Sequence, residues 1–282
     1  MKLRTVLLPV EFTDETALVV AFARGLSSLG VRRVVLAHVV APDGPEGGDV
    51  AGRVDAARAR MEELSTALKD AGLGIEVRVA VGDAVDELGA LAAEAQVDAA
   101  VYGSHAKSIT DQLLVGSVSE RLVRDADVPQ LVARFDLLRN QADPASLLQH
   151  FGEKLVLATD FSLSASRAFM RVIELPKGVV KHIFLLHAVD PGLTGEKLRR
   201  AEEGAEFHMR NLRAVCAQAG IPASVTLRKE SAVNAVLAEL DERRATGVVV
   251  GTRGCNAVQE MLLGSLSMTL IRQASCPVLI VP

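Results

Sequence analysis

An internal repeat constrains this 282-residue chain more than any other feature of its sequence. Gly251-Thr252-Arg253-Gly254 is matched 148 residues earlier by Gly103-Ser104-His105-Ala106. At the same separation, Gly264-Ser265-Leu266-Ser267 is matched by Gly116-Ser117-Val118-Ser119. Register that holds across separate segments indicates two copies of one domain.

The repeat extends beyond these loops and sets the expected domain boundaries. Residues 158–162 are similar to residues 9–13, at a separation of 149. We therefore expect a first domain over residues 1–135, a linker over 136–151 that contains a short helix, and a second domain over 152–282. Each domain has an ordinary size and is long enough to bury most of the surface that its unfolded chain exposes.

Composition narrows the classes of partner. Hydrophobic residues make up 49% of the chain, aromatic residues only 3%, and the formal net charge is −4. Such a chain lacks the basic surface and the stacking platforms that nucleic acids require. No apolar run reaches the roughly 18 residues of a membrane span. We therefore expect neither a nucleic-acid partner nor a membrane partner.

The cysteines point to a reducing compartment. Cys216, Cys255 and Cys276 are odd in number and have no CxxC spacing, which argues against a disulfide framework or a zinc site. The apolar run near the N-terminus soon meets Glu11 and is too short for the core of a signal peptide. The expected location is the cytoplasm.

Each half alternates short apolar runs rich in β-branched residues with longer runs of helical periodicity. The strands predicted in the first half are residues 4–10, 33–39, 75–81, 99–102 and 130–134, and the helices are 15–29, 50–71, 84–94 and 117–125. The strands predicted in the second half are 154–158, 182–187, 224–228, 247–250 and 278–281, and the helices are 164–174, 195–219, 232–242 and 265–273. Continuous apolar strands that alternate with helices indicate parallel sheets covered on both faces. The predicted fold class is α/β, with two similar open parallel sheets.

The second copy of the repeat has the chemistry of a phosphate cradle. Gly251 and Gly254 follow a predicted strand, where glycine permits a tight turn and a close ligand. Gly264-Ser265 opens a helix whose free N–H groups favour an anion. Ser267 adds a hydroxyl donor, and Arg253 reaches an outer phosphate. The alternative is that the glycines only serve turns and that Ser265 only caps its helix.

Two further positions bear on the same site. Asp160, after the first strand of the second domain, is suited to accept hydrogen bonds from a ribose hydroxyl or a base amine, or to cap the helix that follows. In the first domain Glu11 takes its place, and Ala106 stands where the second domain has Gly254. We expect the first domain to have lost phosphate binding. His38 and His187 end the second strands, where we expect them to serve packing.

Several catalytic motifs are missing from the sequence. It contains no G-x-x-x-x-G-K-[ST] loop, no G-x-G-x-x-G after the first strand and no G-x-S-x-G elbow. No triad and no cluster of carboxylates for a two-metal site is evident. Whether the protein is an enzyme stays open, with weak ATP hydrolysis as the limit of what we expect.

These motifs together resemble the universal stress protein family in a tandem two-domain form. The resemblance implies five-stranded parallel sheets of the Rossmann-like, adenine nucleotide alpha hydrolase-like type, paired about a pseudo-twofold axis. It also implies ATP or ADP as the ligand, with an accompanying Mg²⁺ left open. The site residues that it implies are Asp160, Val189, Gly251, Arg253, Gly254, Gly264, Ser265 and Ser267. Lys229-Glu230 departs from the glycine that often opens the third crossover in this family.

The resemblance implies association through the last strand of each domain, residues 128–134 and 277–281. Pairing these strands within one chain or forming a dimer of chains are both compatible with it. The leading hypothesis is a stress-response protein that binds an adenine nucleotide mainly in domain 2, while domain 1 is structural or regulatory. The alternative is a protein-interaction module with vestigial loops and an unknown protein partner.

Overall fold

The structure, a computed structural model, describes residues 3–43, 49–105, 128–252 and 265–282. Backbone contacts divide the chain into two compact units, Met1–Gln149 and His150–Pro282. Predicted features at Ala106, residues 117–125, Arg253, Gly254 and Gly264 lie outside the described residues.

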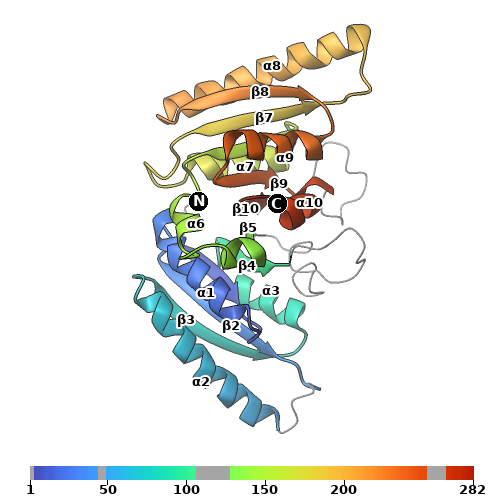
Figure 1. Cartoon of the computed structure of the whole chain (residues 1–282). Coiled ribbons are helices and arrows are strands. Elements are labelled where there is room, and N and C mark those ends of the chain that lie inside the picture. Colours follow the sequence, from blue (N-terminus) through green and yellow to red (C-terminus); the bar gives the residue numbers. More distant parts are fainter. Residues whose placement is uncertain (1–2, 44–48, 106–127, 253–264) are drawn as a thin grey trace. The chain divides into compact units, whose positions relative to one another are not determined.

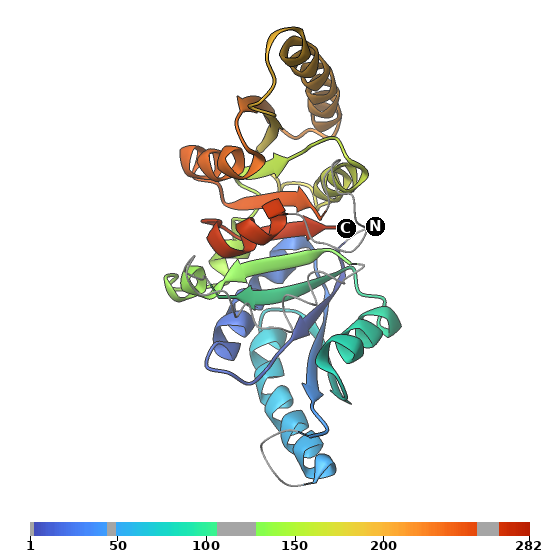
Figure 2. The same ribbon diagram turned by 90° about the vertical axis from the view of Figure 1, so that its right-hand side faces the viewer.

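Unit 1 is an open parallel sheet with helices on both faces. Its strands are β1 (Thr5–Pro9), β2 (Arg33–Val40), β3 (Gly74–Val81), β4 (Ala99–Ser104) and β5 (Gln130–Arg134). They lie in the order β3-β2-β1-β4-β5, and the neighbours pair in parallel. Its described helices are α1 (Thr16–Ala23), the 3₁₀ helix η1 (Arg24–Leu29), α2 (Val50–Lys69), α3 (Ala84–Glu94), α5 (Phe135–Arg139) and α6 (Ser146–Gln149). Helices α1 and α2 cover one face and α3 the other (Figure 1, Figure 2).

Unit 2 repeats this plan. Its strands are β6 (Leu155–Ala158), β7 (Ile183–Val189), β8 (Ala223–Lys229), β9 (Gly247–Gly251) and β10 (Val278–Val281). They lie in the order β10-β9-β6-β7-β8, again in parallel. Its described helices are α7 (Leu163–Ile173), α8 (Gly195–Gln218), α9 (Ala232–Arg243) and α10 (Ser265–Gln273). Helices α7 and α8 cover one face, and α9 and α10 the other (Figure 2).

Burial explains why these runs become central strands. Residues Val6 to Leu8 of β1 are at most 1% exposed, and so are Val248 to Val250 of β9. Strands covered on both faces have no polar side to present, so they are continuous apolar runs. The predicted α/β class with two similar parallel sheets is confirmed.

The segment after β5 packs on unit 1. Helices α5 and α6 pack against α1 and η1, so residues as far as Gln149 belong to unit 1. A Cβ built on Gly25 would lie 2.4 Å from the carbonyl oxygen of Ala145, so only glycine permits this approach. The helix predicted over 15–29 changes at Arg24 into a 3₁₀ helix that ends at Gly30, with φ 90°.

Each unit ties the start of its first strand to the start of its fourth by one polar side chain. Asp98, which is 7% exposed, accepts hydrogen bonds from the N–H groups of Arg4 (2.8 Å) and Thr5 (2.9 Å). At the equivalent place in unit 2, Thr246 Oγ1 accepts from the N–H of Lys154 at 2.9 Å. These contacts satisfy backbone donors that the sheet leaves unpaired.

Candidate functional site

The strand order of unit 2 reverses between β6 and β9. From β6 the chain proceeds outward to β7 and β8, and then returns to β9 and β10 on the other side. Leu157 pairs with Val249, so Thr159 and Asp160 leave β6 at the level where Gly251 ends β9. In open α/β sheets this reversal is where ligands bind.

The N-terminus of α10 is held against the end of β9. Ser267 is 1% exposed, and its hydroxyl donates to the carbonyl oxygen of Gly251 at 3.0 Å. This hydroxyl therefore holds the helix in place, and its proton is engaged within the protein in place of the phosphate contact that the sequence predicted. Ser265, the first residue of the helix, is exposed. The first N–H groups of a helix have no partner within it and carry the positive end of its dipole. The fold therefore places the N-terminal end of a helix beside Gly251.

Gly251 also has a packing reason to be glycine. A Cβ built there would lie 2.5 Å from Ser164 Oγ and 2.8 Å from the backbone nitrogen of Ala165. Helix α7 thus begins against the end of β9, and the contact with backbone atoms leaves no room for a side chain. Gly251 can therefore allow the close packing of α7 and also border a ligand.

Asp160 lies in a tightly determined turn. Its Oδ1 accepts from the N–H of Ser162 at 3.0 Å, and the Ser162 hydroxyl caps α7 by accepting from the N–H of Ala165 at 3.2 Å. Phe161 between them has φ 64°, a conformation that costs energy for a bulky residue. The turn fixes the carboxylate at the edge where the strand order reverses.

Aromatic stacking compensates the strained turn. The ring of Phe161 stacks on His187, with centroids 4.5 Å apart, and lies 4.9 Å from the ring of His208 in α8. His187 Nδ1 lies 2.8 Å from the carbonyl oxygen of Thr159. These contacts agree with the packing role expected for His187, while Phe161 and His208 are residues that sequence reasoning missed.

The remaining predicted residue, Val189, ends β7 and is 4% exposed. Its partner across the sheet is Lys229, the last residue of β8. Of the eight predicted residues, five lie at the carboxyl ends of strands β6, β7 and β9 or at the start of α10. These are Asp160, Val189, Gly251, Ser265 and Ser267.

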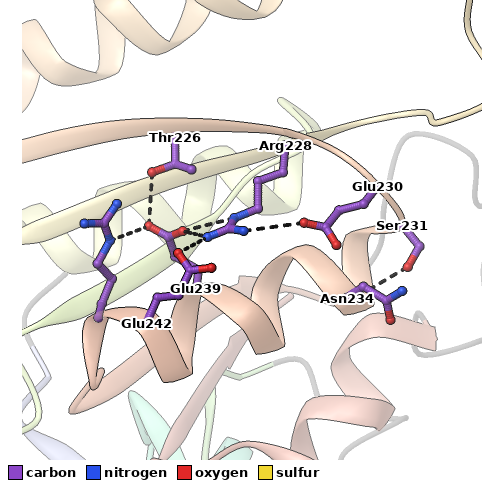
Figure 3. A network of polar contacts seen from close by, with 8 residues as sticks. Thr226, Arg228, Glu230, Ser231, Asn234, Glu239 and Glu242 are labelled. Atoms are coloured by element: carbon purple, nitrogen blue, oxygen red, sulfur yellow. Dashed lines mark hydrogen bonds and ion pairs between the residues drawn. The ribbon is translucent and has the colours of Figure 1, made fainter.

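A network of polar contacts around a buried carboxylate lies beside Lys229-Glu230, the pair that stands where the family often has glycine (Figure 3). The sequence did not predict this network. Glu239 in α9 is fully buried and accepts from Arg228 (2.7 Å), Arg243 (2.9 Å) and Thr226 (3.0 Å). Burial opposes its ionisation, but these hydrogen bonds outweigh burial and lower its pKa. Arg228 also lies 2.5 Å from Glu242, and its hydrogen bonds to Glu242 and Glu239 raise the pKa of Arg228. The network fixes β8 to α9.

Unit 1 has a cavity of about 280 Å³ at the corresponding edge of its sheet. Its lining comes from the ends of β1, β2 and β4, from the starts of α1 and α3, and from Phe135. The lining residues are Pro9, Val10, Glu11, Thr13, Glu15, Thr16, Val19, Ala37, His38, Val39, Ala84, Leu88, Tyr102, Gly103, Ser104, His105 and Phe135.

The turn after β1 in unit 1 resembles the turn after β6 in unit 2, but Glu11 stands in place of Asp160. Phe12 has φ 54°, and its ring lies tilted against that of His38, with centroids 4.2 Å apart. His38 Nδ1 lies 2.8 Å from the carbonyl oxygen of Val10. The guanidinium of Arg60 lies 4.6 Å from the Phe12 ring, where unit 2 has His208. Both turns therefore place a phenylalanine of positive φ against the histidine of the second strand, but only α7 has a side-chain N-cap, Ser162, whereas α1 has none.

Comparison with known proteins decides the family. The chain matches the universal stress protein family over residues 2–134 and again over residues 152–282. It belongs to the universal stress protein family. The repeated match shows that this universal stress protein is a tandem two-domain form, as the sequence motifs predicted.

Individual relatives agree with this assignment. The universal stress protein MJ0577 of Methanocaldococcus jannaschii is 24% identical over 153 residues, which cover 46% of this chain and 94% of that protein. The universal stress protein YxiE of Bacillus subtilis is 26% identical over 145 residues, which cover 45% of this chain and 97% of that protein. A universal stress protein structure from Archaeoglobus fulgidus has a TM-score of 0.78 at 23% identity and covers 100% of this chain and 99% of its own.

Two features are absent from the described residues. No helix among them is long and apolar enough to cross a membrane. No group of three His, Cys, Asp or Glu side chains among them is arranged to hold a metal ion.

Proposed function

We propose that this universal stress protein binds an adenine nucleotide, ATP or ADP, in unit 2. The observation that carries the proposal is the contact between Ser267 and Gly251, which holds the start of α10 beside the end of β9. This places free helix N–H groups where the strand order reverses. The intact glycine pattern of the second repeat supplies the loop between them.

The roles follow from the positions of the residues. The helix N-terminus at Ser265 and the loop glycines Gly254 and Gly264 hold the phosphates, with Arg253 at the outermost one. Asp160 receives a hydrogen bond from the ribose or the base, and the backbone at Val189 borders the base. Unit 1 lacks the glycine at Ala106 and is not assigned a phosphate site.

Isothermal titration with ATP tests the proposal. The wild-type chain should bind one nucleotide, and Gly264→Val should abolish binding because Val replaces a glycine that we propose holds the phosphates. Gly116→Val, at the equivalent position of unit 1, is the matched control and should leave the affinity unchanged. Two sites per chain, or equal affinity in Gly264→Val, would contradict the proposal.

One observation favours the interaction module as a second function. Leu163 and Met170 lie seven residues apart on α7 and are 68% and 49% exposed. An exposed apolar pair on one helical face is suited to a protein partner. In that case no adenine nucleotide should stabilise the fold, whereas a ligand at 100 times its Kd stabilises by about 2.7 kcal/mol. A thermal-shift titration separates the two functions.

A further inference from the structure

The outer side of helix α7 presents a stripe of apolar and charged side chains to solvent. Leu163 and Met170 are 68% and 49% exposed, and the exposed Arg167 lies between them in the sequence. Residues three and four positions apart lie on the same side of a helix, so these residues form one continuous stripe, which Glu174 extends. The residues that α7 buries lie on the opposite side, and they are Ser164, Ala165, Ala168, Phe169 and Val172.

Unit 1 shows what covers the equivalent helix of the repeat. Helix α1 stands 149 residues before α7, and α5 and α6 pack along α1 and the adjoining η1. Leu138 of α5 and Leu148 of α6 are fully buried. Two ion pairs hold the same segment, because Arg139 Nη2 lies 2.6 Å from Glu15 Oε1 and Asp143 Oδ1 lies 3.8 Å from Arg24 Nη1. Apolar contacts and ion pairs together therefore hold a helical segment on this side of unit 1.

Helix α7 has no comparable cover within the described part of the chain. Its main contacts are with strands β9, β10 and β6 beneath it, and no described helix packs on it as α5 packs on α1. Its outer positions nevertheless carry larger apolar side chains than those of α1. Leu163 stands where unit 1 has Asp14, and Met170 stands where unit 1 has Ala21. Because a helix side that faces only water is normally polar, this difference indicates that another molecule covers α7.

The charges around the stripe favour an acidic occupant. Four of the five charged side chains on α7 and the turn after it are basic: Arg167, Arg171, Lys177 and Lys181 against Glu174. The whole chain has a formal net charge of −4, so this side is opposite in sign to the protein as a whole. A second copy of α7 would bring basic side chains together, which disfavours self-association through this side.

We propose that α7 of unit 2 is a docking surface for an acidic amphipathic helix of a partner protein. Apolar side chains of that helix cover Leu163 and Met170, and its carboxylates pair with Arg167. An amphipathic helix that lays its apolar side on a protein surface is a recurring mode of peptide recognition. The proposal rests on the second function given above, the interaction module, and it does not require nucleotide binding in unit 2.

The test selects helical peptides on the full chain. The probe is a library of peptides about 16 residues long, a length at which an isolated helix can form, with leucines at helical spacing and Glu, Gln or Lys at the flanking positions. Glu-rich peptides should be enriched. In fluorescence anisotropy the best of them should bind roughly five- to tenfold more tightly than the same peptide with Gln in place of Glu, and added salt should reduce this difference. No enrichment, or enrichment of the Gln or Lys peptides, would overturn the inference.

Substitutions of exposed side chains locate the surface. Arg167→Glu should weaken binding of the selected acidic peptide roughly fivefold and should strengthen binding of its Lys counterpart. Arg210→Glu, at an exposed position of α8, is the matched control and should change neither. Leu163→Ser should weaken binding roughly fivefold, whereas Phe207→Ser, at a position of α8 that is 57% exposed, should not. All four variants should keep the melting temperature of the wild type, and equal effects on the two helices would contradict the assignment.

Other occupants of α7 would give different results. Self-association in analytical ultracentrifugation that Leu163→Ser abolishes would assign the surface to a second copy of the chain. Binding to vesicles of phosphatidylglycerol and phosphatidylcholine that Arg167→Glu abolishes, without enrichment of acidic peptides, would assign it to an anionic membrane. Either result would overturn the inference.

The outcomes also separate the acidic partner from the functions proposed above. If Gln or Lys peptides are enriched and Leu163→Ser abolishes their binding, the interaction module stands and the acidic partner fails. If ATP does not bind but acidic peptides bind at α7 as described, the nucleotide function fails and the acidic partner stands.

Discussion

Glu239 offers the sharpest test of how unit 2 is held together. The side chain is fully buried and accepts hydrogen bonds from Arg228, Arg243 and Thr226. Breaking a buried ion pair by removing one partner usually costs about 3–5 kcal/mol, because the other partner stays buried without its charge. Here Arg228 keeps Glu242, and Arg243 is 40% exposed and can turn to water. We therefore expect Glu239→Ala to lower the free energy of unfolding by about 3 kcal/mol, the lower end of that range.

The pH dependence of this loss has a definite sign. The folded-state pKa of Glu239 lies below its ordinary value of 4.5. A lowered carboxyl pKa contributes stability that is fully present above the unfolded value and is lost as the pH falls through the folded value. The difference in the free energy of unfolding between wild type and Glu239→Ala should therefore be constant at neutral pH and shrink once the pH drops below about 4.5.

The assay is urea unfolding by circular dichroism, combined with hydrogen exchange of residues 223–243 to assign the change to unit 2. Glu94→Ala is the matched control, because Glu94 occupies the equivalent of Glu242 in α3, is 62% exposed and pairs with Arg78 at 3.2 Å. Exposed pairs contribute little, so this variant should unfold close to wild type. A loss for Glu239→Ala no larger than that for Glu94→Ala, or a loss that persists unchanged to pH 3, would refute the reasoning.

Three further predictions test the packing. Gly251→Ala should destabilise the protein by about 1–3 kcal/mol in thermal unfolding, and Ser164→Ala should not rescue it, since backbone atoms of α7 also block the new Cβ. Asp98→Ala should cost about 2 kcal/mol in urea unfolding, because two N–H groups at the start of β1 lose their acceptor; a change below about 0.5 kcal/mol would contradict this. Burial raises the pKa of Cys216 to about 11 and of Cys276 to about 12, so mass spectrometry should find neither alkylated by iodoacetamide at pH 8 until urea unfolds the chain.

Local sequence signals predicted the regular elements well. The strands 130–134 and 278–281 and the helices 84–94 and 265–273 are observed with the predicted bounds. Strand burial, helical periodicity and capping residues act within a few neighbours, and for that reason they can be read from a single sequence. The helix predicted over 15–29 deviates at a point where a distant segment intervenes, since Gly25 meets Ala145.

The features that sequence reasoning missed depend on contacts between distant segments. At the position of α9 occupied by Glu239, unit 1 has Leu91, and nothing local shows that the carboxylate will face Arg228 of β8. The one signal in the sequence was the difference between Leu91 in the first copy of the repeat and Glu239 in the second. The position of Phe135 over Gly103 is likewise invisible from either segment alone.

The glycines of the repeat show why a motif needs its surroundings before it reports a ligand. Both Gly103 and Gly251 are required by packing, since a Cβ at either would collide with atoms already in place. Glycine at this position therefore marks a strand end that something approaches closely, and it does not by itself identify what approaches. In unit 2 the neighbour is the start of α7, with the start of α10 held alongside through Ser267, and helix N-termini favour anions. In unit 1 the neighbours are the ring of Phe135 and the side chain of Val19 in α1, so side chains occupy the space beside the same glycine. The same glycine thus marks a close neighbour in both copies, while the chemistry of that neighbour differs between them.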